Sequence, residues 1–529
     1  MHCRSSASFV KTSHPLPDVS LNFSVAYFAG SRPLTAWLAY FLIGALTMLS
    51  FAPFGWFPAA FLFVLPLICA FRYCEPRLAA RLGFAWGAGL FLAGTYWLYV
   101  SIHIFGQAPP AVATFMMIAL VVIMAIYYAA AGWLVATLRG QSGWQFVGVM
   151  STIWVFLEWL RGWMLSGFPW MTLGYSQIDS WLAGFAPVLG IYGISLMLML
   201  SACALLEVFE SNGRSRTVFA VFAVLPWIAG AMLKPISWTV PAGPAVKTTI
   251  VQGGISQDRK WQRAQFGVTL DLYRNSLQEH NDSDLVVWPE VAIPSVLDQV
   301  GDYVSLLQQY VAANNTTLLF GILERDASLQ QVFNSVIAID GNSQQVYRKR
   351  HLVPFGEYFP VPAFMREWLR MMNLPYSDIT SGEAVQSLLV MPDGNQLAVA
   401  ICYEDAYAAE QLYAFPDATI LINVSNDAWF SDSIAPHQHL EIARMRALEA
   451  GRYVVRATNN GVSAFIAPDG SLLDTGPQFE HVTMTHDIIP LVGSTLYARV
   501  GNWPVILLCL VVPGWFAWRQ RYASNKSFQ

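Results

Sequence analysis

One cysteine of the chain occupies a position that suits a catalytic nucleophile. Cys402 follows the apolar run LAVAI at residues 397–401, and two carboxylates, Glu404 and Asp405, come soon after it. A side chain at the carboxyl end of a strand leaves the sheet and points into the crevice beside it. A thiol with an ordinary pKa of about 8.5 reacts near neutral pH only beside a base or a positive charge. A buried, inert core cysteine is the alternative.

The other five cysteines do not complete a site with Cys402. They lie in or beside the apolar segments of the chain: Cys3, Cys69, Cys74, Cys203 and Cys509. Exposed cysteines in an oxidising compartment usually pair, and Cys402 has no partner in its own part of the chain. No second cysteine or closely spaced histidine gives it a zinc-ligand spacing. We therefore expect no metal and no other cofactor.

A histidine is one group that could activate the thiol. Six histidines lie in the same part of the chain: His280, His351, His437, His439, His481 and His486. Cys–His pairs are a common solution to thiol activation, so the inventory leaves a papain-like arrangement open.

A carboxylate and a lysine are a second way to activate the thiol. Glu290 follows an apolar run in DLVVWPEVAIP, where Pro289 interrupts regular strand pairing. Lys349 lies in the basic run of YRKRHLVPFGEYFP, eight residues before Glu357. The carboxylate would act as the base, and one cation would stabilise an oxyanion. The alternative is a solvated loop charge at Glu290 and a solvated or lipid-facing basic patch.

The part of the chain that must position these residues, 237–502, alternates strands with helices. Short β-rich runs occur at 248–251, 285–287, 317–322, 335–339, 397–401, 419–424 and 464–466. Helical patterns lie between several of them, at 264–279, 301–313 and 437–450. This alternation predicts a layered α/β domain, and about 250 residues are enough for its own core. The Pro/Gly-rich stretch 240–245 predicts a linker into it.

The composition of the whole chain indicates a membrane protein. Of its 529 residues, 55% are hydrophobic and only 12% are charged, whereas a soluble protein carries about 25% charged residues. This supply of charge is too small to coat a globule in water, which argues against disorder, a coiled coil and a purely soluble enzyme. The net charge of −4 gives no support for nucleic-acid binding.

Apolar runs close to the length that crosses a bilayer fill the first part of the chain and return at its end. We predict about eight transmembrane helices, near 34–52, 57–71, 83–105, 110–138, 144–160, 182–209, 217–236 and 503–518. The predicted organisation is an N-terminal segment (1–33), a bundle of about seven helices (34–236), the α/β domain (237–502), a last helix (503–519) and a tail (520–529). The first helix is expected to be retained, because no cleavage site follows a compact apolar region.

The distribution of Lys and Arg predicts the orientation. These residues precede the first span, follow the last one and occupy alternate loops, whereas the other loops are nearly free of them; Arg161 is the exception. The positive-inside rule then places both termini in the cytoplasm and residues 237–502 outside, which in a bacterium is the periplasm.

The segments around Glu290, Lys349 and Cys402, in this order, resemble the nitrilase (carbon–nitrogen hydrolase) superfamily and its Glu–Lys–Cys triad. Apolar helices on both sides narrow the resemblance to the apolipoprotein N-acyltransferases, integral membrane enzymes of bacterial lipoprotein maturation. It covers almost the whole chain, in the motifs GWMLSGFPWMTLGYSQID, VQGGISQDRKW, VVWPEVAIP, KRHLVPFGEYFP, AICYED, INVSNDAWF, RMRALEAGRYVVRATNNG and YARVGNWP.

The resemblance implies a role for each matching residue. Glu290 would be the general base, Lys349 the oxyanion cation and Cys402 the nucleophile. Further matches are residues that support the triad or engage substrate in the family: Glu357, Tyr403 and Glu404 in the first role, and Trp261 in the second. The implied fold is a four-layer αββα sandwich on a membrane body of eight helices.

The resemblance also implies the reaction and its partners. An acyl chain would pass from a phospholipid, typically phosphatidylethanolamine, to the α-amine of the lipid-modified N-terminal cysteine of a lipoprotein. The order would be ping-pong, with a thioester on Cys402 and release of lysophospholipid before the amine attacks. The expected setting is the bacterial inner membrane, with a monomeric enzyme whose catalytic domain faces the periplasm.

Two apolar segments suggest contact with lipid near the site. FPVPAFMREWLRMMNLPY, residues 359–376, predicts a lid that dips into the outer leaflet; an ordinary packed helix is the alternative. GWMLSGFPWMTLGYSQ, residues 162–177, predicts either a re-entrant wall of the lipid entrance or interfacial anchoring by Trp163 and Trp170.

Two other classes of function compete with the transferase. A membrane-anchored amidase would use the same triad, but one anchor helix would suffice for a soluble substrate. A transporter with an exported sensor domain would need ionisable groups within its spans. The spans hold few: Glu158 and Glu207 lie near predicted ends, and His103 lies at a loop.

Overall fold

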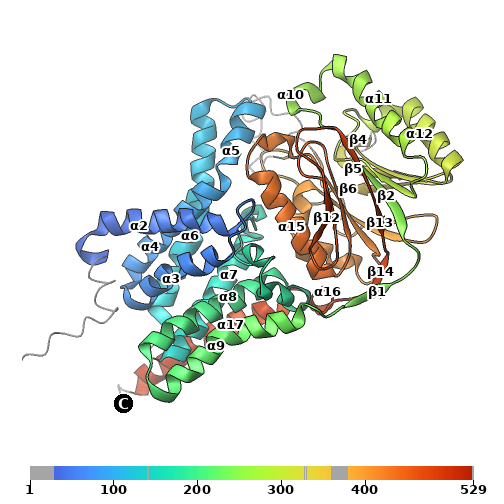
Figure 1. The fold of residues 1–529 in the computed structure, drawn as a ribbon. Helices are drawn as coiled ribbons and strands as arrows, with labels where there is room; N and C mark the ends of the chain where they lie inside the picture. The colour runs from blue at the N-terminus through green and yellow to red at the C-terminus, as the bar shows by residue number, and fades with distance from the viewer. Residues whose placement is uncertain (1–28, 140–141, 327, 329–330, 359–378, 527–529) are drawn as a thin grey trace, which may run out of the picture.

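The computed structural model describes residues 29–139, 142–326, 328, 331–358 and 379–526 and consists of two parts (Figure 1). The first and last helices of the chain form a helical body, and the residues between them form an α/β domain on one side of it. The main helices of the body are α2 (Pro33–Thr47), α3 (Pro58–Tyr73), α4 (Pro76–Thr95), α6 (Pro110–Leu138), α7 (Gly143–Arg161), α8 (Ala186–Glu210), α9 (Gly213–Leu233) and α17 (Trp503–Lys526).

Within these described residues, five helices are long and apolar enough to cross a membrane: Pro33–Ser50, α4, α6, Trp181–Glu210 and α9. The helix α3 and the apolar part of α17, Trp503–Arg519, are shorter apolar helices. The helix α7 has 19 residues, among them Glu158 and Arg161. The expected multi-pass body is confirmed, but five helices rather than eight meet the length and hydropathy that a span requires.

The predicted third span, 83–105, has the wrong bounds. The helix α4 already begins at Pro76, and the short α5 (Trp97–Val100) and a π-helical turn, Ser101–Phe105, follow it. Arg77 and Arg81 fall in the loop between the predicted spans 57–71 and 83–105, but they lie in the first turns of α4, where both are exposed. Proline suits the first helical position, and long basic side chains near a helix end reach the interface, so neither residue type interrupts the helix.

Small residues let the helices of the body approach each other closely. A Cβ atom on Gly89 of α4 would lie 1.9 Å from the carbonyl oxygen of Phe41 in α2, and one on Gly44 would lie equally close to that of Trp86. On the other side of α4, a Cβ atom on Gly83 would lie 2.3 Å from the carbonyl oxygen of Tyr128 in α6. Such backbone contact is how membrane helices pack where the hydrophobic effect does not drive them together.

The α/β domain contains two six-stranded sheets. The first has the order β13-β2-β3-β4-β5-β6 and the second the order β12-β11-β10-β9-β8-β7. The strands of the first are β2 (Val246–Gln252), β3 (Leu285–Val287), β4 (Thr317–Asp326), β5 (Gln331–Ile339), β6 (Gln344–Arg348) and β13 (Val482–Ile488). Those of the second are β7 (Leu389–Val390), β8 (Gln396–Ile401), β9 (Ile420–Ser425), β10 (Val454–Thr458), β11 (Ala464–Ile466) and β12 (Leu472–Thr475). The strands β1 (Thr239–Pro241) and β14 (Leu491–Gly493) form a separate two-stranded sheet.

The two sheets pack face to face, with helices outside. Ile250 and Leu319 of the first sheet meet Val399 and Ile422 of the second in one apolar cluster. The helices α11 (Arg263–Glu279) and α12 (Gly301–Asn314) cover the outer face of the first sheet, and α15 (Ala435–Ala450) covers that of the second. The expected αββα sandwich is therefore confirmed. Burial on both faces explains why the central strands are continuous apolar runs.

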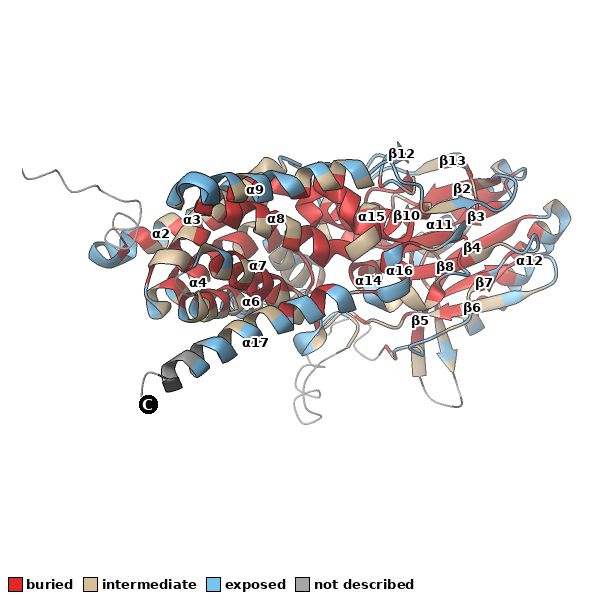
Figure 2. Cartoon of the chain, turned by 90° about the horizontal axis from the view of Figure 1, so that it is seen from below, coloured by how far each residue is buried: buried red, intermediate tan, exposed pale blue. Residues whose placement is uncertain are grey.

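The helix α15 also joins the sandwich to the membrane body. Ile442 and Met445 belong to the apolar core of the body, and α15 lies between α8 and β10 (Figure 2). The buried amide of Gln438 accepts a hydrogen bond from the indole of Trp170 at 2.8 Å and another from the indole of Trp97 at 3.2 Å. The α/β domain is thus held against the helical body by α15, which belongs to the apolar cores of both parts.

Candidate functional site

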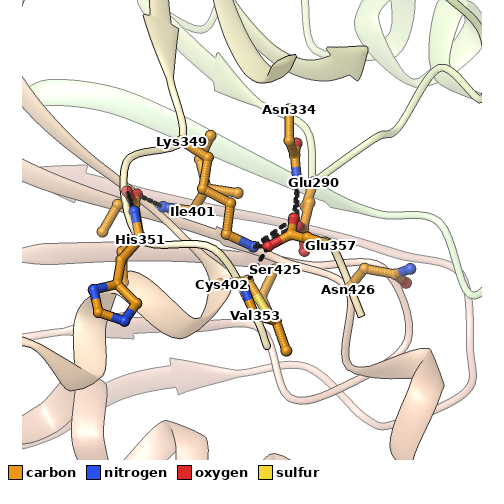
Figure 3. Close-up of polar contacts among 12 residues, drawn as sticks. Glu290, Asn334, Lys349, His351, Val353, Glu357, Ile401, Cys402, Ser425 and Asn426 are labelled. Carbon is orange, nitrogen blue, oxygen red and sulfur yellow. Dashed lines mark hydrogen bonds and ion pairs between the residues drawn. The ribbon is translucent and has the colours of Figure 1, made fainter. Parts of the chain in front are cut away.

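The three residues predicted to do chemistry meet beside the carboxyl ends of three strands. Glu290 follows β3, Lys349 follows β6, and Cys402 follows β8. The Lys349 Nζ atom lies 3.4 Å from Glu290 Oε1, and the Cys402 side chain lies beside both groups (Figure 3). Strands from both sheets therefore bring together residues that are far apart in the sequence.

Lys349 is buried among carboxylates. Only 1% of its side chain is exposed, and Nζ lies 2.9 Å from the Glu357 carboxylate. The amide of Asn334 donates to both carboxylates, at 2.7 Å to Glu290 and 3.0 Å to Glu357. Burial alone would lower the pKa of Lys349, but the charges of Glu357 and Glu290 raise it above its ordinary value. The ammonium is therefore charged and suited to stabilise an oxyanion.

Cys402 opens a tight turn, Cys402–Ala406, with a backbone φ of 53°. Burial, followed by the charge of Glu290, raises the pKa of the thiol well above its ordinary value, and Lys349 opposes this rise. The resting residue is therefore a thiol and needs a base at the moment of reaction. The Glu290 carboxylate faces it, so the geometry supports a carboxylate base rather than a pre-formed thiolate.

Glu404 connects the turn of Cys402 to the segment that carries Lys349. Its buried carboxylate accepts hydrogen bonds from the backbone N–H groups of Ile401 and Arg350, each at 2.6 Å, and of His351 at 3.2 Å. The hydroxyl of Tyr347 donates to it as well, at 3.1 Å. One carboxylate thus ties together the strand ends before the nucleophile and after the cation.

Tyr403 points to the membrane body rather than to the triad. Its hydroxyl donates to the carbonyl oxygen of Gly167 at 3.2 Å, and its ring stacks on Trp170. The hydroxyl of Tyr407 donates to the same carbonyl oxygen at 3.0 Å, and that of Tyr358 donates to the Ser166 hydroxyl at 2.8 Å. The loop after α7 therefore holds the tyrosines that flank the site.

The structure of this loop tests one of the two predictions for residues 162–177, namely that Trp163 and Trp170 anchor it at the membrane interface. Trp163 is 54% exposed, as an interfacial anchor requires, but Trp170 is buried and bonded to Gln438. Anchoring by Trp170 is therefore wrong, whereas the re-entrant wall stays a prediction. The other predicted lipid-contacting segment, 359–376, lies outside the described residues.

Trp261 directly follows the short helix α10 (Gln257–Lys260). Its side chain is 38% exposed. The preceding Lys260 is buried and donates from Nζ to the main-chain oxygen of Glu290 at 3.2 Å. Burial lowers the pKa of Lys260 to about 8, against the opposing charge of Glu290. Trp261 is thus the neighbour in sequence of Lys260, whose ammonium group holds the backbone at Glu290.

A buried ionic cluster beneath Cys402 was not predicted. The His439 ring lies 2.9 Å from Asp427 and 3.0 Å from Asp405, and its Nε2–H also donates to the carbonyl oxygen of Cys402 at 3.2 Å. Arg456 lies 2.9 Å from Asp427. Burial and Arg456 lower the pKa of His439, but the two aspartates outweigh them and raise it to about 9. A charged Arg456 inside the apolar run YVVRAT was the sequence signal for this cluster.

The position of His439 in this cluster argues against a histidine as the base that activates the Cys402 thiol. His439 contacts the backbone of Cys402 and carries its proton at neutral pH, so it is a donor rather than a base. His351, the other histidine close to the site, bonds to Glu410 at 2.9 Å and to the Ser166 carbonyl oxygen at 3.2 Å. Neither geometry is that of a papain-like base.

Two family models and several relatives match the chain. The model "Apolipoprotein N-acyltransferase N-terminal domain" matches residues 43–204, and the model "Carbon-nitrogen hydrolase" matches residues 247–496. An apolipoprotein N-acyltransferase of Nitrosomonas europaea is 40% identical over 468 residues, which is 88% of this chain and 93% of that protein. One of Methylococcus capsulatus is 37% identical over 485 residues, 91% of this chain and 96% of that protein.

Solved structures that resemble the domain include an amidase from Nesterenkonia sp., at 16% identity and a TM-score of 0.36, over 50% of this chain and 97% of that one. These two relatives match most of both chains, so the match includes the membrane body as well as the α/β domain. The chain belongs to the apolipoprotein N-acyltransferase family and contains a carbon–nitrogen hydrolase domain.

Proposed function

We propose that the protein transfers a fatty acyl chain from a phospholipid, typically phosphatidylethanolamine, to the α-amino group of the S-diacylglyceryl N-terminal cysteine of a lipoprotein precursor. The observation that carries the proposal is the buried constellation of Glu290, Lys349 and Cys402 against a membrane body. Family membership supports an acyltransferase; the phospholipid donor and the thioester intermediate are what the resemblance to this family implies, and the site is compatible with both.

In the first half-reaction, Glu290 takes the proton of the Cys402 thiol, and the sulfur attacks the carbonyl carbon of the phospholipid ester. The charge of the tetrahedral intermediate develops on its oxygen, where the Lys349 ammonium stabilises it. The carbon–oxygen bond to the glycerol then breaks. The leaving alkoxide takes the proton from Glu290, so lysophospholipid departs and a thioester stays on Cys402.

In the second half-reaction, the α-amine of the acceptor attacks the thioester carbonyl. Glu290 accepts the proton that the nitrogen loses, Lys349 again stabilises the oxyanion, and the carbon–sulfur bond breaks. The products are the N-acylated lipoprotein and the Cys402 thiol, which recovers the proton from Glu290. Exclusion of water favours aminolysis over hydrolysis, and a site packed against a membrane body is suited to it.

The same proposal assigns a location. The protein would lie in the inner membrane of a bacterium, with both termini in the cytoplasm and the α/β domain in the periplasm. The distribution of Lys and Arg along the chain supports this orientation. Both substrates carry acyl chains, so a site beside the outer surface of this membrane would reach them without extracting either from the lipid layer.

Incubation of the purified protein with phosphatidylethanolamine and a synthetic S-diacylglyceryl-cysteine peptide tests the transfer. We expect N-acyl peptide and lysophospholipid in equal amounts by mass spectrometry. The matched variants Glu290→Gln, Lys349→Met and Cys402→Ser should each lose this product, while Arg274→Lys on the outer helix α11 should not. Free fatty acid in place of N-acyl peptide would identify a hydrolase, the competing function that the same triad allows.

A further inference from the structure

The structure contains an open pocket that the acyl transfer does not use. Its volume is about 840 Å³, and it lies where the helices α7 and α17 of the body meet the α/β domain. Its walls come from the end of α7, the start of α17, the short helices α14 (Ala408–Gln411) and α16 (Leu496–Val500), and the loops at 412–416 and 493–494. Figure 2 shows α14 and α16 close together beside the start of α17.

The pocket is separate from the active site but next to it. None of Glu290, Lys349 and Cys402 lines it. Its wall residue Tyr413 lies 4.6 Å from the Arg350 guanidinium, and the backbone N–H of Arg350 donates to Glu404. A ligand in the pocket would therefore lie one layer of side chains away from the residues that hold the nucleophile.

The chemistry of the walls is amphiphilic. Apolar and aromatic side chains dominate, among them Trp159, Leu412, Phe415 and Ile506. Arg499 is the one charged side chain among the described residues that line the pocket, and it is exposed. A guanidinium at the edge of an apolar pocket fits an anionic group joined to an apolar chain, because arginine binds phosphate through paired hydrogen bonds.

Two tryptophans at helix ends line the pocket. Trp159 lies in the last turn of α7, and Trp503 is the first residue of α17 and 67% exposed. Tryptophans at the ends of membrane helices lie at the headgroup level. Below Trp503, α17 exposes Leu507, Leu510 and Val511, so the apolar wall of the pocket continues into a lipid-facing helix surface.

We infer that this pocket binds an accessory glycerophospholipid that is distinct from the acyl donor. Its phosphate contacts Arg499, its glycerol lies between Trp159 and Trp503, and its acyl chains follow the exposed face of α17. Free phosphate would satisfy only Arg499, and a plain hydrocarbon would satisfy only the apolar walls. The combination of the two selects a phospholipid.

Photolabelling of the Cys402→Ser protein in detergent tests the inference without turnover. The probe is phosphatidylethanolamine with a diazirine early in one acyl chain, and the labelled peptides are mapped by mass spectrometry. We expect label in two segments, 409–416 and 493–506, in addition to any label near residue 402. Both Arg499→Glu, which reverses the charge, and Ala409→Trp, which fills the pocket, should reduce it there at least five-fold.

Two controls separate lipid binding from misfolding and from simpler ligands. Arg499→Lys retains the charge and should retain the label, as should Arg274→Glu on the outer helix α11, which does not line the pocket. Unlabelled phosphatidylethanolamine should compete, whereas glycerophosphoethanolamine, which lacks acyl chains, should not. Absence of label from both segments, equal label in Arg499→Glu, or full competition by glycerophosphoethanolamine would each overturn the inference. The label is read in an inactive protein, so failure of the proposed transfer reaction would leave this result intact.

Discussion

Among individual residues, Cys402 shows most clearly how the site depends on its surroundings. A non-glycine residue with a φ of 53° is strained, at a cost on the order of 1–2 kcal/mol. Glu404 holds the strand end before it, and His439 holds its carbonyl oxygen. The strain directs the sulfur to Glu290 and Lys349 and persists because these buried hydrogen bonds outweigh it.

Ionisation of His439 makes a testable contribution to stability. Its pKa is about 9 in the folded protein, above the ordinary value, so its contribution is complete below about pH 6.5 and is lost as the pH rises through about 9. A shift of this size corresponds to about 3 kcal/mol. The melting temperature of the parent protein should therefore exceed that of His439→Gln at pH 7, and the difference should shrink by pH 10. A difference that is constant with pH would show that His439 is not charged in the folded state.

The identity of the oxyanion cation could be predicted from the sequence only in part. Charge alone did not distinguish it from Arg348 and Arg350; the resemblance did. The structure supplies the physical reason: Arg348 forms an ion pair with Glu324 at 2.6 Å, and Arg350 donates to Tyr347 at 2.9 Å. His439 and Asp427 could not be predicted as a pair, because only the fold brings β9 and α15 together behind the nucleophile.

At the scale of elements, the turn that carries Glu290 depends on Gly321 in the neighbouring strand β4. A Cβ atom there would lie 2.4 Å from the Val291 nitrogen and 2.7 Å from Glu290 Cα. Gly321→Ala should displace the base and slow thioester formation by about 100-fold, since small misplacements of a catalytic group have effects of this size. Single-turnover formation of the acyl-enzyme measures it.

Gly267→Ala is the matched control for this variant. Gly267 lies in α11, and a Cβ atom there would meet nothing within 4 Å, so the variant should keep the parent rate and be slightly more stable, by up to about 1 kcal/mol. Equal rates in Gly321→Ala and Gly267→Ala would mean that the contact with β4 does not position Glu290.

The packing of α2 on α4 makes a second prediction about elements. Gly89→Ala would bring a methyl group within 1.9 Å of the Phe41 carbonyl oxygen, so the two helices must separate and lose their contact. We expect a clearly lower melting temperature in detergent. Gly514→Ala in α17, where a Cβ atom meets nothing within 4 Å, should not lower it. Equal melting temperatures would show that this close approach does not stabilise the body.

The elements themselves were predictable to different degrees. All seven predicted strands and the three predicted helices of the α/β domain occur, because continuous apolar runs and helical periodicity carry that information. The strand β10 was missed, since Arg456 interrupts its apolar pattern and is neutralised by two carboxylates distant in the sequence, Asp405 and Asp427. Polar strands such as β12 and β13 were missed for a related reason: their partners in the sheet, rather than their composition, make them strands.

For the whole molecule, α15 and Tyr403 make the sandwich and the membrane body one unit, so the orientation of the body determines the compartment of the site. Leu472 is exposed on the edge strand β12, and Ser215 is exposed at the start of α9. In spheroplasts, a membrane-impermeant maleimide should label Leu472→Cys at once but Ser215→Cys only after permeabilisation. The parent protein provides the background of its own cysteines. The reverse pattern would place the α/β domain in the cytoplasm.

The most direct test of the account is the intact mass of the purified protein after incubation with phosphatidylethanolamine and no acceptor, beside the same measurement on Cys402→Ser. We predict one added fatty-acyl mass on the parent, none on the variant, and discharge of the adduct by a diacylglyceryl-cysteine peptide. An unmodified parent protein that nevertheless N-acylates the peptide, or a variant that does so equally well, would contradict the thioester on Cys402.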